Sequence, residues 1–358
     1  MITIPSPKTV VYLIPTNAIG GVELAAASVP SGQHGGLHLE KYYLASSPPF
    51  GNTASEDCYG PRVSLNSPKV YLAAIRRILV TKPDLVVASL WRSVLVMMIC
   101  KLLRPSLKTV VFLHNTNTGH SVDRIVNAMG LRLATQVWTD STATFKARLG
   151  PTLQPKGRVV SFLLNRREAD DRPAITPDFI FWGRLRKQKN VGRAVELFSN
   201  IRDKYSEATF RIIGPDGGNE GKIADTIRSL KLEDAVSMMG PMDHAQIAAS
   251  SKSASFYLQT SDNEGMCMSV VEAMQSGLIP LVTPVGEIAH YCEDGVNAVF
   301  IEEYEQTVNA ITELLNDPDK ARAMAKAAAD TWREASLYRE DFLHLSRALL
   351  ECSDEAAN

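Results

Sequence analysis

Short apolar runs rich in β-branched residues alternate along this chain with longer segments whose apolar positions repeat every three or four residues. In the first half, the short runs predict strands over residues 9–14, 37–44, 85–89, 109–113 and 136–139. The longer segments predict helices over residues 71–80, 94–103 and 122–133, and residues 20–28 are expected to lead from a loop into a helix. Such alternation is typical of a mainly parallel sheet covered by helices.

Residues 151–177 show neither pattern, and the strand–helix alternation begins again after them. Strands are predicted over residues 179–182, 209–213, 235–239, 254–258, 281–283 and 298–301. Helices are predicted over residues 191–205, 223–230, 268–275, 308–315, 318–331 and 337–351. Residues 46–61 hold many Pro, Gly, Ser and Asn and predict a loop. The pattern therefore indicates two successive βαβ domains.

We expect the domain bounds at 1–165 and 166–335, followed by a last helix and tail at 336–358. In such folds ligands bind at the carboxyl ends of the strands. The expected site is therefore a cleft between the two domains.

Composition adds a charge asymmetry to this picture. The 358 residues are 45% hydrophobic and 22% charged, with a net charge of -1, so nothing global indicates a nucleic-acid partner. Residues 1–168 hold 19 Lys and Arg against 8 Asp and Glu, whereas the remainder holds 19 against 31. The basic half favours an anionic partner, such as a membrane surface or a lipid-linked substrate. Solvated surface charge is the alternative.

The cysteine pattern and the hydropathy of the chain predict the cellular compartment of the protein. The five cysteines form no C-x-x-C pair, which is typical of reduced thiols in a cytoplasmic protein. Residues 1–7 lack the apolar core of a signal peptide, and the longest apolar run, residues 94–100, is far shorter than the roughly 20 residues that span a bilayer. We expect a cytoplasmic protein that is either soluble or peripheral on the inner face of the membrane.

The segment N-E-G-M-C-M-S-V-V-E-A, residues 263–273, places two carboxylates around a predicted helix start. The first N–H groups of a helix have no internal partner and favour anions such as phosphate. Glu272 lies about one turn into the helix, where it can accept hydrogen bonds from a vicinal diol such as a ribose. Glu264 precedes the helix and can accept from sugar hydroxyls, while Gly265 allows close approach of the backbone. On spacing alone, a capping carboxylate and a solvated helix face are the simpler alternative.

The longer segment E-G-M-C-M-S-V-V-E-A-M-Q-S-G-L-I-P-L-V resembles the signature of retaining family-four glycosyltransferases of the GT-B fold. The matching positions are Glu264, Gly265, Glu272, Ala273, Met274, Gly277 and Pro280. Upstream, F-W-G-R-L-R-K-Q-K-N at 181–190 resembles the G-R-L-x-x-x-K-G segment of the same family. The resemblance implies that Arg184 and Lys189 bind the donor diphosphate, although Asn190 replaces the usual glycine. Two fixed cations would stabilise the charge of the leaving group, so no metal is expected.

Three shorter segments match the same family. A-I-G-G-V-E at 18–23 looks like its G-G-x-E loop, which makes Gly20 and Gly21 candidates for an acceptor or phosphate loop. V-F-L-H-N at 111–115 places His114 where the family has a histidine facing the transferred sugar; a structural histidine that closes a strand is the alternative. In I-I-G-P-D-G-G at 212–218, Gly214 matches a loop beside the nucleotide. This loop is not G-x-G-x-x-G, which disfavours an oxidoreductase.

The resemblance implies an α/β GT-B fold whose N-terminal domain binds the acceptor, whose C-terminal domain binds a nucleotide-sugar, and whose last helix crosses back. The expected activity is retaining, metal-independent transfer of a sugar from a UDP- or GDP-linked donor to a glycan or lipid-linked acceptor, in cell-surface polysaccharide or glycolipid synthesis. No cofactor beyond the donor is expected.

In this interpretation Glu272 binds the ribose, and Glu264 orients the donor sugar together with the backbone amides of Gly265, Met266, Cys267 and Met268. The leaving phosphate oxygen takes the acceptor proton. Further features depart from the family pattern. The loop at 285–290 is shortened, and the N-G-V-D segment at the domain linker is absent, with only a partial match in S-F-L-L-N at 161–165. Met-Cys-Met also replaces an aromatic–glycine–leucine run. A nucleotide-sugar epimerase of the same fold and a catalytically silent sugar-binding homologue remain alternatives.

Overall fold

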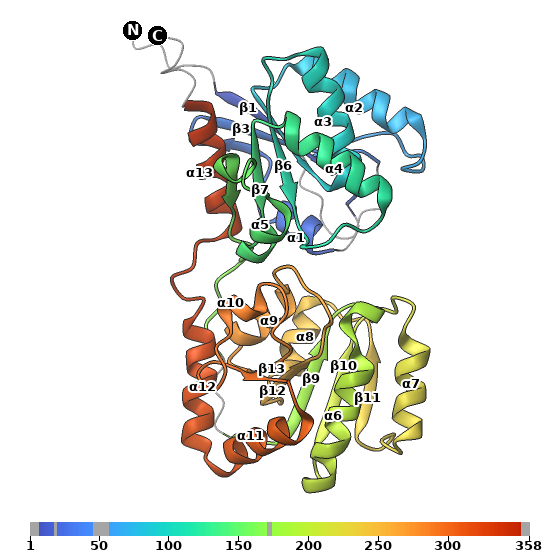
Figure 1. Cartoon of the computed structure of the whole chain (residues 1–358), viewed down its shortest axis with the longest axis vertical. Helices are drawn as coiled ribbons and strands as arrows, with labels where there is room; N and C mark the ends of the chain where they lie inside the picture. The colour runs from blue at the N-terminus through green and yellow to red at the C-terminus, as the bar shows by residue number, and fades with distance from the viewer. Residues whose placement is uncertain (1–6, 18–19, 46–56, 170–173, 352–358) are drawn as a thin grey trace. The chain divides into compact units, whose positions relative to one another are not determined.

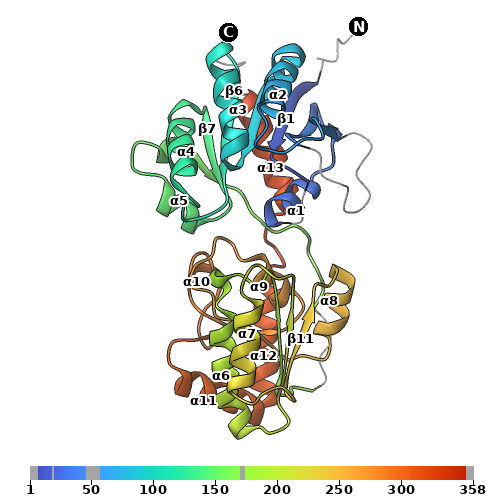
Figure 2. The ribbon, with the colours of Figure 1, turned by 90° about the vertical axis from the view of Figure 1, so that its right-hand side faces the viewer.

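The computed structural model describes residues 7–17, 20–45, 57–169 and 174–351. The chain divides into two compact units, and each is a sheet flanked by helices (Figures 1 and 2). The N-terminal unit contains Met1–Leu164 and Ser336–Asn358, and the C-terminal unit contains Asn165–Ala335.

The N-terminal unit is built on an eight-stranded sheet with the order β2-β3-β1-β5-β6-β7-β8, and β4 pairs with β3. The strands are β1 Lys8–Ile14, β2 Gly32–His34, β3 Leu37–Tyr43, β4 Cys58–Tyr59, β5 Leu85–Ser89, β6 Lys108–Leu113, β7 Gln136–Thr139 and β8 Gly157–Val159. Only the β2–β3 pair is antiparallel among the described strand pairs of this sheet. Strand order reverses between β1 and β5, so the carboxyl ends of these two strands mark a topological switch point.

The helices of this unit are α1 Gly21–Ala27, α2 Pro68–Thr81, α3 Leu90–Leu103, α4 Ser121–Leu133, α5 Thr142–Arg148 and α13 Tyr338–Glu351, with a short 3-10 turn η1 at Gln154–Lys156. Helix α2 begins three residues before its predicted start because the side chain of Ser67 accepts a hydrogen bond from the amide of Lys69, and Pro68 suits the first helical position. Helix α3 begins directly after β5, with Leu90 at a φ of +66°.

The C-terminal unit has a six-stranded, fully parallel sheet with the order β11-β10-β9-β12-β13-β14. Its strands are β9 Asp178–Trp182, β10 Thr209–Ile213, β11 Val236–Gly240, β12 Phe256–Gln259, β13 Ile279–Val282 and β14 Val299–Phe300. Its helices are α6 Val191–Lys204, α7 Glu220–Ser229, α8 His244–Ser251, α9 Met268–Gln275, α10 Ile288–Tyr291, α11 Tyr304–Asn316 and α12 Pro318–Asp330, with a 3-10 turn η2 at Lys187–Lys189. Strand order reverses between β9 and β12, which makes their carboxyl ends the expected ligand edge.

Several regions differ from the sequence prediction, which gave no element for the short helices α5, α8 and α10 or for the strand β2. Residues 151–177, expected to be irregular, contain η1 and β8, and β8 pairs with β7. Within the loop predicted over 46–61, Cys58 and Tyr59 form β4 beside β3, while residues 46–56 lie outside the described residues. Strands of two or three residues are too short to show a period of two, and they form because a neighbouring strand supplies their hydrogen bonds.

Helix α13 packs in the N-terminal unit. Its first residue, Tyr338, stacks with Phe112 of β6 at 6.0 Å between ring centroids, and Tyr12 of β1 lies 5.1 Å from Phe342. Near its other end, the carbonyl of Leu349 accepts a hydrogen bond of 2.9 Å from the ammonium of Lys108. The chain thus returns to its first unit, as predicted for the last helix.

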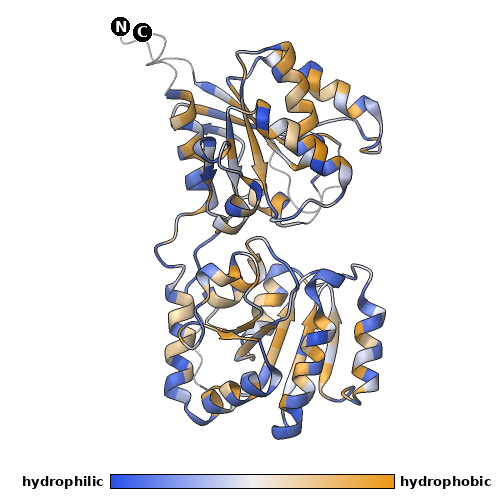
Figure 3. Ribbon diagram, viewed as in Figure 1, coloured by the Kyte–Doolittle hydropathy of each residue, from blue (hydrophilic) through white to orange (hydrophobic). Residues whose placement is uncertain are grey.

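Hydropathy follows the layers of both units. The strands are mostly apolar, whereas the helices carry both apolar and polar residues (Figure 3). None of the helices in the described ranges is both long and apolar enough to span a bilayer.

Candidate functional site

Two loops meet at the switch point of the C-terminal sheet. One follows β9 and contains η2; the other follows β12 and leads into α9. The amide of Asp262 donates to the carbonyl of Gln188 at 2.9 Å, and the side chain of Gln188 donates to the carbonyl of Asn263 at 2.5 Å. The side chain of Asn190 donates to Asp262 at 2.8 Å. These bonds hold the two predicted motifs side by side, although 75 residues separate Gln188 from Asn263.

An ion pair between Lys189 and Glu264 forms the centre of this site. The ammonium lies 2.8 Å from Oε1 of Glu264, and the two side chains are only 19% and 7% exposed. The side-chain amide of Gln259 donates to the same carboxylate oxygen at 3.0 Å. Burial lowers the pKa of Lys189, but Cys267 and Glu264 reverse that shift and leave the pKa above its usual value. Lys189 is therefore a fixed cation at neutral pH, held against the carboxylate of Glu264.

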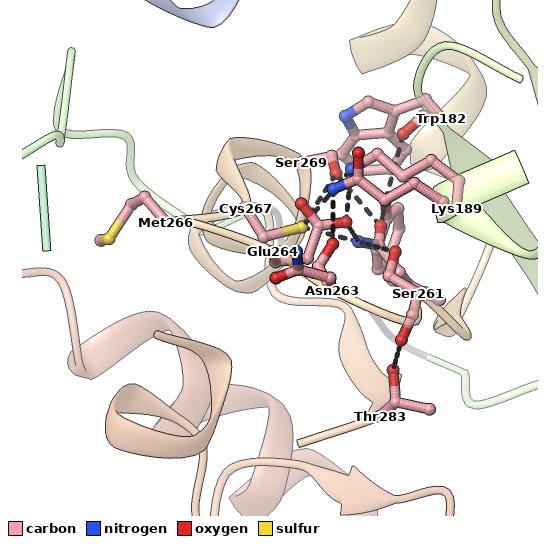
Figure 4. A network of polar contacts seen from close by, with 12 residues as sticks. Trp182, Lys189, Ser261, Asn263, Glu264, Met266, Cys267, Ser269 and Thr283 are labelled. Carbon is pink, nitrogen blue, oxygen red and sulfur yellow. Dashed lines mark hydrogen bonds and ion pairs between the residues drawn. The ribbon is translucent and has the colours of Figure 1, made fainter. Parts of the chain in front are cut away.

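Cys267 occupies the turn that opens α9. Its φ of +55° is a left-handed conformation that favours glycine, which fits a position where glycine is common in the family. Its sulfur lies 2.6 Å from Nε2 of Gln259 and 3.9 Å from the Lys189 ammonium (Figure 4). Burial, followed by the charge of Glu264, raises the pKa of Cys267 to about 11. The group is therefore a protonated thiol at neutral pH.

Glu272 has a separate partner. It lies in the second turn of α9, and Nε1 of Trp182 donates a hydrogen bond of 2.9 Å to its Oε2. Tyr257 fixes Trp182 in turn: the two rings are 4.5 Å apart in an edge-on arrangement, and the Tyr257 hydroxyl donates to the Trp182 carbonyl at 3.1 Å. Trp182 therefore orients Glu272 from the end of β9.

The shortened loop at 285–290 supports the segment that bears Glu264. Gly286 has a φ of +60°, and a Cβ atom there would lie 2.1 Å from the carbonyl oxygen of Glu264. The amide of Glu287 donates to the carbonyl of Gly265 at 3.1 Å, and the hydroxyl of Tyr291 donates to the carbonyl of Met266 at 3.0 Å. The loop that is shortened relative to the family pattern therefore contacts the backbone of residues 264–266 directly.

The remaining predicted residues of this unit lie outside the polar cluster that Lys189, Glu264, Gln259 and Cys267 form. Gly214 has a φ of +150°, and a Cβ atom there would lie 1.9 Å from the carbonyl oxygen of Gly183, so the two glycines let the loops after β9 and β10 touch. Arg184 is exposed and follows β9 by two residues. Met268 is the first residue of α9, and the side chain of Met266 extends away from the cluster (Figure 4).

His114, Gly20 and Gly21 belong to the N-terminal unit. His114 directly follows β6, and its Nε2 lies 2.8 Å from Oγ of Ser89 at the end of β5. Burial lowers the pKa of His114 to about 3, so the ring is neutral. Gly20 precedes α1 with an extended φ of -165° that any residue adopts, and Gly21 is the first residue of α1.

Sequence reasoning missed three supporting side chains. Gln259 offered a signal, because it is a polar residue at the end of an otherwise apolar strand, F-Y-L-Q. Trp182 and Tyr291 offered none, because aromatic residues are common in any core. No group of three or more His, Cys, Asp or Glu is placed to hold a metal ion within the ranges that the structure describes.

Comparison with known proteins finds a family that the C-terminal unit matches. Residues 165–331 match the family described as glycosyl transferases group 1. The match covers almost the whole of the C-terminal unit, which is therefore similar to a group 1 glycosyltransferase domain. The curated relatives include the alpha-monoglucosyldiacylglycerol synthase of Acholeplasma laidlawii, 26% identical over 150 residues, which are 42% of this chain and 37% of that protein.

A second relative is the GDP-mannose:cellobiosyl-diphosphopolyprenol alpha-mannosyltransferase of Komagataeibacter xylinus, 25% identical over 211 residues, or 54% of this chain and 53% of that protein. The chain thus spans about a third to a half of the length of these two relatives.

Among solved structures, HepE of Anabaena in complex with UDP and glucose has a TM-score of 0.76 at 17% identity, and the match covers 95% of this chain and 98% of that one. The likeness concerns the fold, and it confirms the predicted GT-B class.

Proposed function

We propose that the chain is a retaining, metal-independent glycosyltransferase that moves a sugar from a UDP- or GDP-linked donor to a glycan or lipid-linked acceptor, in cell-surface polysaccharide or glycolipid synthesis. The observation that carries this proposal is the buried Lys189–Glu264 pair at the ligand edge of a parallel sheet, with Glu272 on the helix that begins there. A cation beside two carboxylates suits a ligand that offers both phosphates and hydroxyls. The match of residues 165–331 to the group 1 family and the names of the curated relatives support the same activity.

The hydrogen-bonding capacity of the cluster fits a nucleotide-sugar. The Lys189 ammonium has three donors and gives one to Glu264 and a long one to Cys267, which leaves one for a diphosphate oxygen. Arg184 adds a second cation for the charge that develops on the leaving diphosphate. Glu272 gives one oxygen to Trp182 and keeps acceptor capacity for a ribose diol.

We propose that the substrate itself, and not a side chain, takes the proton of the acceptor hydroxyl. His114 is a poor general base, because its pKa of about 3 lies far below neutral pH. We therefore assign the acceptor proton to the departing phosphate oxygen, which lies on the face that the acceptor attacks. This assignment agrees with retention of configuration, and it requires neither an enzymic base nor a cofactor.

The proposed lipid-linked acceptor agrees with the surface of the N-terminal unit. Among the described residues, nine exposed large apolar side chains lie in this unit and three in the C-terminal unit. On α4, Val122, Ile125 and Met129 are 49%, 59% and 50% exposed and share one face at helical spacing. Arg124 and Arg132 are exposed on the same helix. We propose that this face, called here the α4 face, contacts an anionic bilayer.

The transferase proposal is tested by donor hydrolysis across UDP-, GDP-, ADP- and dTDP-sugars in EDTA. Wild type is compared with Glu264→Gln and Arg184→Ala, and the control is Lys187→Ala, an exposed lysine of the same 3-10 turn. We expect slow release of one nucleotide, unchanged in the control. In both site variants we expect a loss of about 100-fold or more, the usual cost of removing one charge-stabilising group.

The other outcomes separate the alternatives. Conversion of the donor sugar without nucleotide release would indicate the epimerase. Tight binding without turnover, even with lipid or glycan acceptors, would indicate the silent homologue. Release that both site variants retain would contradict the assigned donor site, and an inverted product anomer would contradict retention.

A further inference from the structure

Three buried hydroxyl groups in the N-terminal unit form a hydrogen-bonded chain that ends on His114. The Tyr338 hydroxyl contacts the Tyr12 hydroxyl at 3.2 Å, Tyr12 contacts Oγ of Ser89 at 2.8 Å, and Ser89 contacts Nε2 of His114 at 2.8 Å. Tyr338, Tyr12 and Ser89 are each 0% exposed. The chain thus links α13, β1, β5 and the residue after β6, across 326 residues of sequence between its two tyrosines.

The protons of this chain can point in two directions. Three hydroxyl protons fill three contacts if every O–H points towards His114, so that Ser89 donates to Nε2. In the reverse direction, Nε2–H would donate to Ser89, and the O–H of Tyr338 would point away from the chain. Tyr338 has no acceptor other than Tyr12 among the hydrogen bonds of the described residues. Each direction leaves one donor without a partner in the described residues: the O–H of Tyr338 in the reverse direction and the Nδ1–H of His114 in the direction towards His114. Tyr338 is fully buried, whereas His114 follows β6 at the ligand edge, where a bound ligand can accept from Nδ1–H, so the direction towards His114 is favoured.

A proton donated to Nε2 places the imidazole proton on Nδ1. Burial raises the pKa of Tyr12 to about 12, and burial likewise keeps Tyr338 protonated. Both tyrosines therefore remain neutral donors. In the described part of the chain, Nδ1 of His114 is buried and has no hydrogen-bond partner. A buried N–H of this kind requires an explanation, and a functional role is one.

We propose that Tyr338, Tyr12 and Ser89 are positioning residues that hold His114 as the Nδ1–H tautomer, so that it donates to an acceptor oxygen of a bound ligand. Ser89 and His114 lie at the carboxyl ends of β5 and β6, beside the switch point between β1 and β5, where ligands of such sheets bind. The ligand is a molecule that offers hydroxyl or phosphoryl oxygens, and its assignment as the donor sugar rests on the proposed function. The chain re-enters the N-terminal unit at Ser336, and Tyr338 follows two residues later as the first residue of α13. The last helix therefore supplies the hydroxyl that sets the tautomer.

The tautomer is measured on the intact chain by long-range ¹H–¹⁵N correlation of the histidine side chains near neutral pH, without ligand. His114→Gln identifies the His114 signals. We expect a protonated Nδ1 and an unprotonated Nε2 in the wild type. Tyr338→Phe removes the O–H that sets the direction, and we expect a mixture of tautomers or a switch to Nε2–H. Tyr71→Phe is the control, because its hydroxyl donates to the carbonyl of Leu65 elsewhere in the same unit.

A protonated Nε2 in the wild type overturns the proposal, as does a tautomer that Tyr338→Phe leaves unchanged. If that variant does not fold, Tyr12→Phe interrupts the same chain and carries the same expectation. Addition of the donor identified by hydrolysis is the second step, and we expect the Nδ1–H signal to shift. An unshifted signal at saturation overturns the ligand contact but not the transferase activity, so the two proposals fail separately.

Discussion

The two glutamates of the 263–273 segment differ in their surroundings. Glu264 is 6% exposed and paired with a buried ammonium, whereas Glu272 is partly exposed and receives an indole N–H. Removal of one partner from a buried ion pair leaves an uncompensated charge, which typically costs about 3–5 kcal/mol. For this reason Glu264→Gln, which keeps shape and one acceptor, separates function from folding better than Glu264→Ala.

At the residue scale, Trp182→Phe tests whether the indole N–H orients Glu272. The ring stays apolar and planar, so packing against Tyr257 is largely kept. We expect nucleoside diphosphate binding to weaken about tenfold, which is roughly 1.4 kcal/mol, because the carboxylate loses a charge-assisted donor. Isothermal titration calorimetry with the nucleotide found in the donor panel measures this change.

A 2′,3′-dideoxy form of the same nucleotide provides the control for this prediction. It lacks the diol that Glu272 is proposed to bind, so the substitution should change its affinity little. Equal losses for both nucleotides would show that Trp182 acts through packing rather than through Glu272.

At the element scale, the loop after β13 supports the loop after β12. Gly286 permits this contact in two ways: its φ of +60° suits glycine, and the space a Cβ would need is filled by the carbonyl of Glu264 at 2.1 Å. A side chain there must displace the backbone that positions Glu264. The shortened loop therefore supports the site through its backbone, although none of its side chains was predicted to bind the donor.

Gly286→Ala and Gly295→Ala form a matched pair that separates backbone strain from displacement of Glu264. Gly295 has a similar φ of +73°, but a Cβ atom there meets nothing within 4 Å. We expect each variant to lose about 1–2 kcal/mol of stability from left-handed strain, with a further loss in Gly286→Ala. Urea unfolding measures both.

Only Gly286→Ala should also weaken donor binding, by about tenfold or more, because a misplacement of about 1 Å at a site is costly. If Gly295→Ala weakens binding as much, the effect arises from general destabilisation and not from the contact with Glu264.

At the scale of the whole molecule, charge and exposed apolar surface are distributed unequally. Residues 1–168 have an excess of Lys and Arg, and most of the exposed large apolar side chains of the described residues belong to the N-terminal unit. Helix α4 is apolar on both sides: Gly130 packs so closely on α3 that a Cβ atom would lie 2.3 Å from Val94, while the α4 face is exposed. A helix that is apolar on its outer side requires a partner.

Flotation with liposomes tests the α4 face. We expect binding to anionic liposomes at low salt and release at high salt, because surface charge attraction is screened within about 10 Å at 0.1 M salt. Val122→Gln should weaken binding about fivefold, since burial of a half-exposed valine contributes about 1 kcal/mol. Val296→Gln is matched in residue type and in exposure, 49% for both, but lies in the C-terminal unit.

Binding that is equal for neutral and anionic liposomes would contradict the electrostatic part of this proposal. Equal effects of the two valine substitutions would contradict the assignment to α4. Neither result would bear on donor hydrolysis, which requires no membrane.

The sequence by itself indicated the longer elements and the residues of the donor motif. Helix α9 runs from Met268 to Gln275 as predicted, because an apolar repeat and a preceding glycine-containing loop are local signals. The alternation of strands and helices predicted a mainly parallel sheet in each unit, since parallel neighbours need helical crossovers. The resemblance of two motifs indicated Glu264, Glu272, Arg184 and Lys189, and their roles as donor ligands stay predictions.

Only the tertiary structure decided which of these groups meet. Lys189 contacts Glu264 across 75 residues, Trp182 contacts Glu272 across 90, and Tyr338 contacts Tyr12 across 326. Hydrophobic periodicity reports which face of an element is buried, but it does not report the order of strands in a sheet. That order places β9 next to β12 and β1 next to β5, and so it decides which strand ends, and which side chains, share a site.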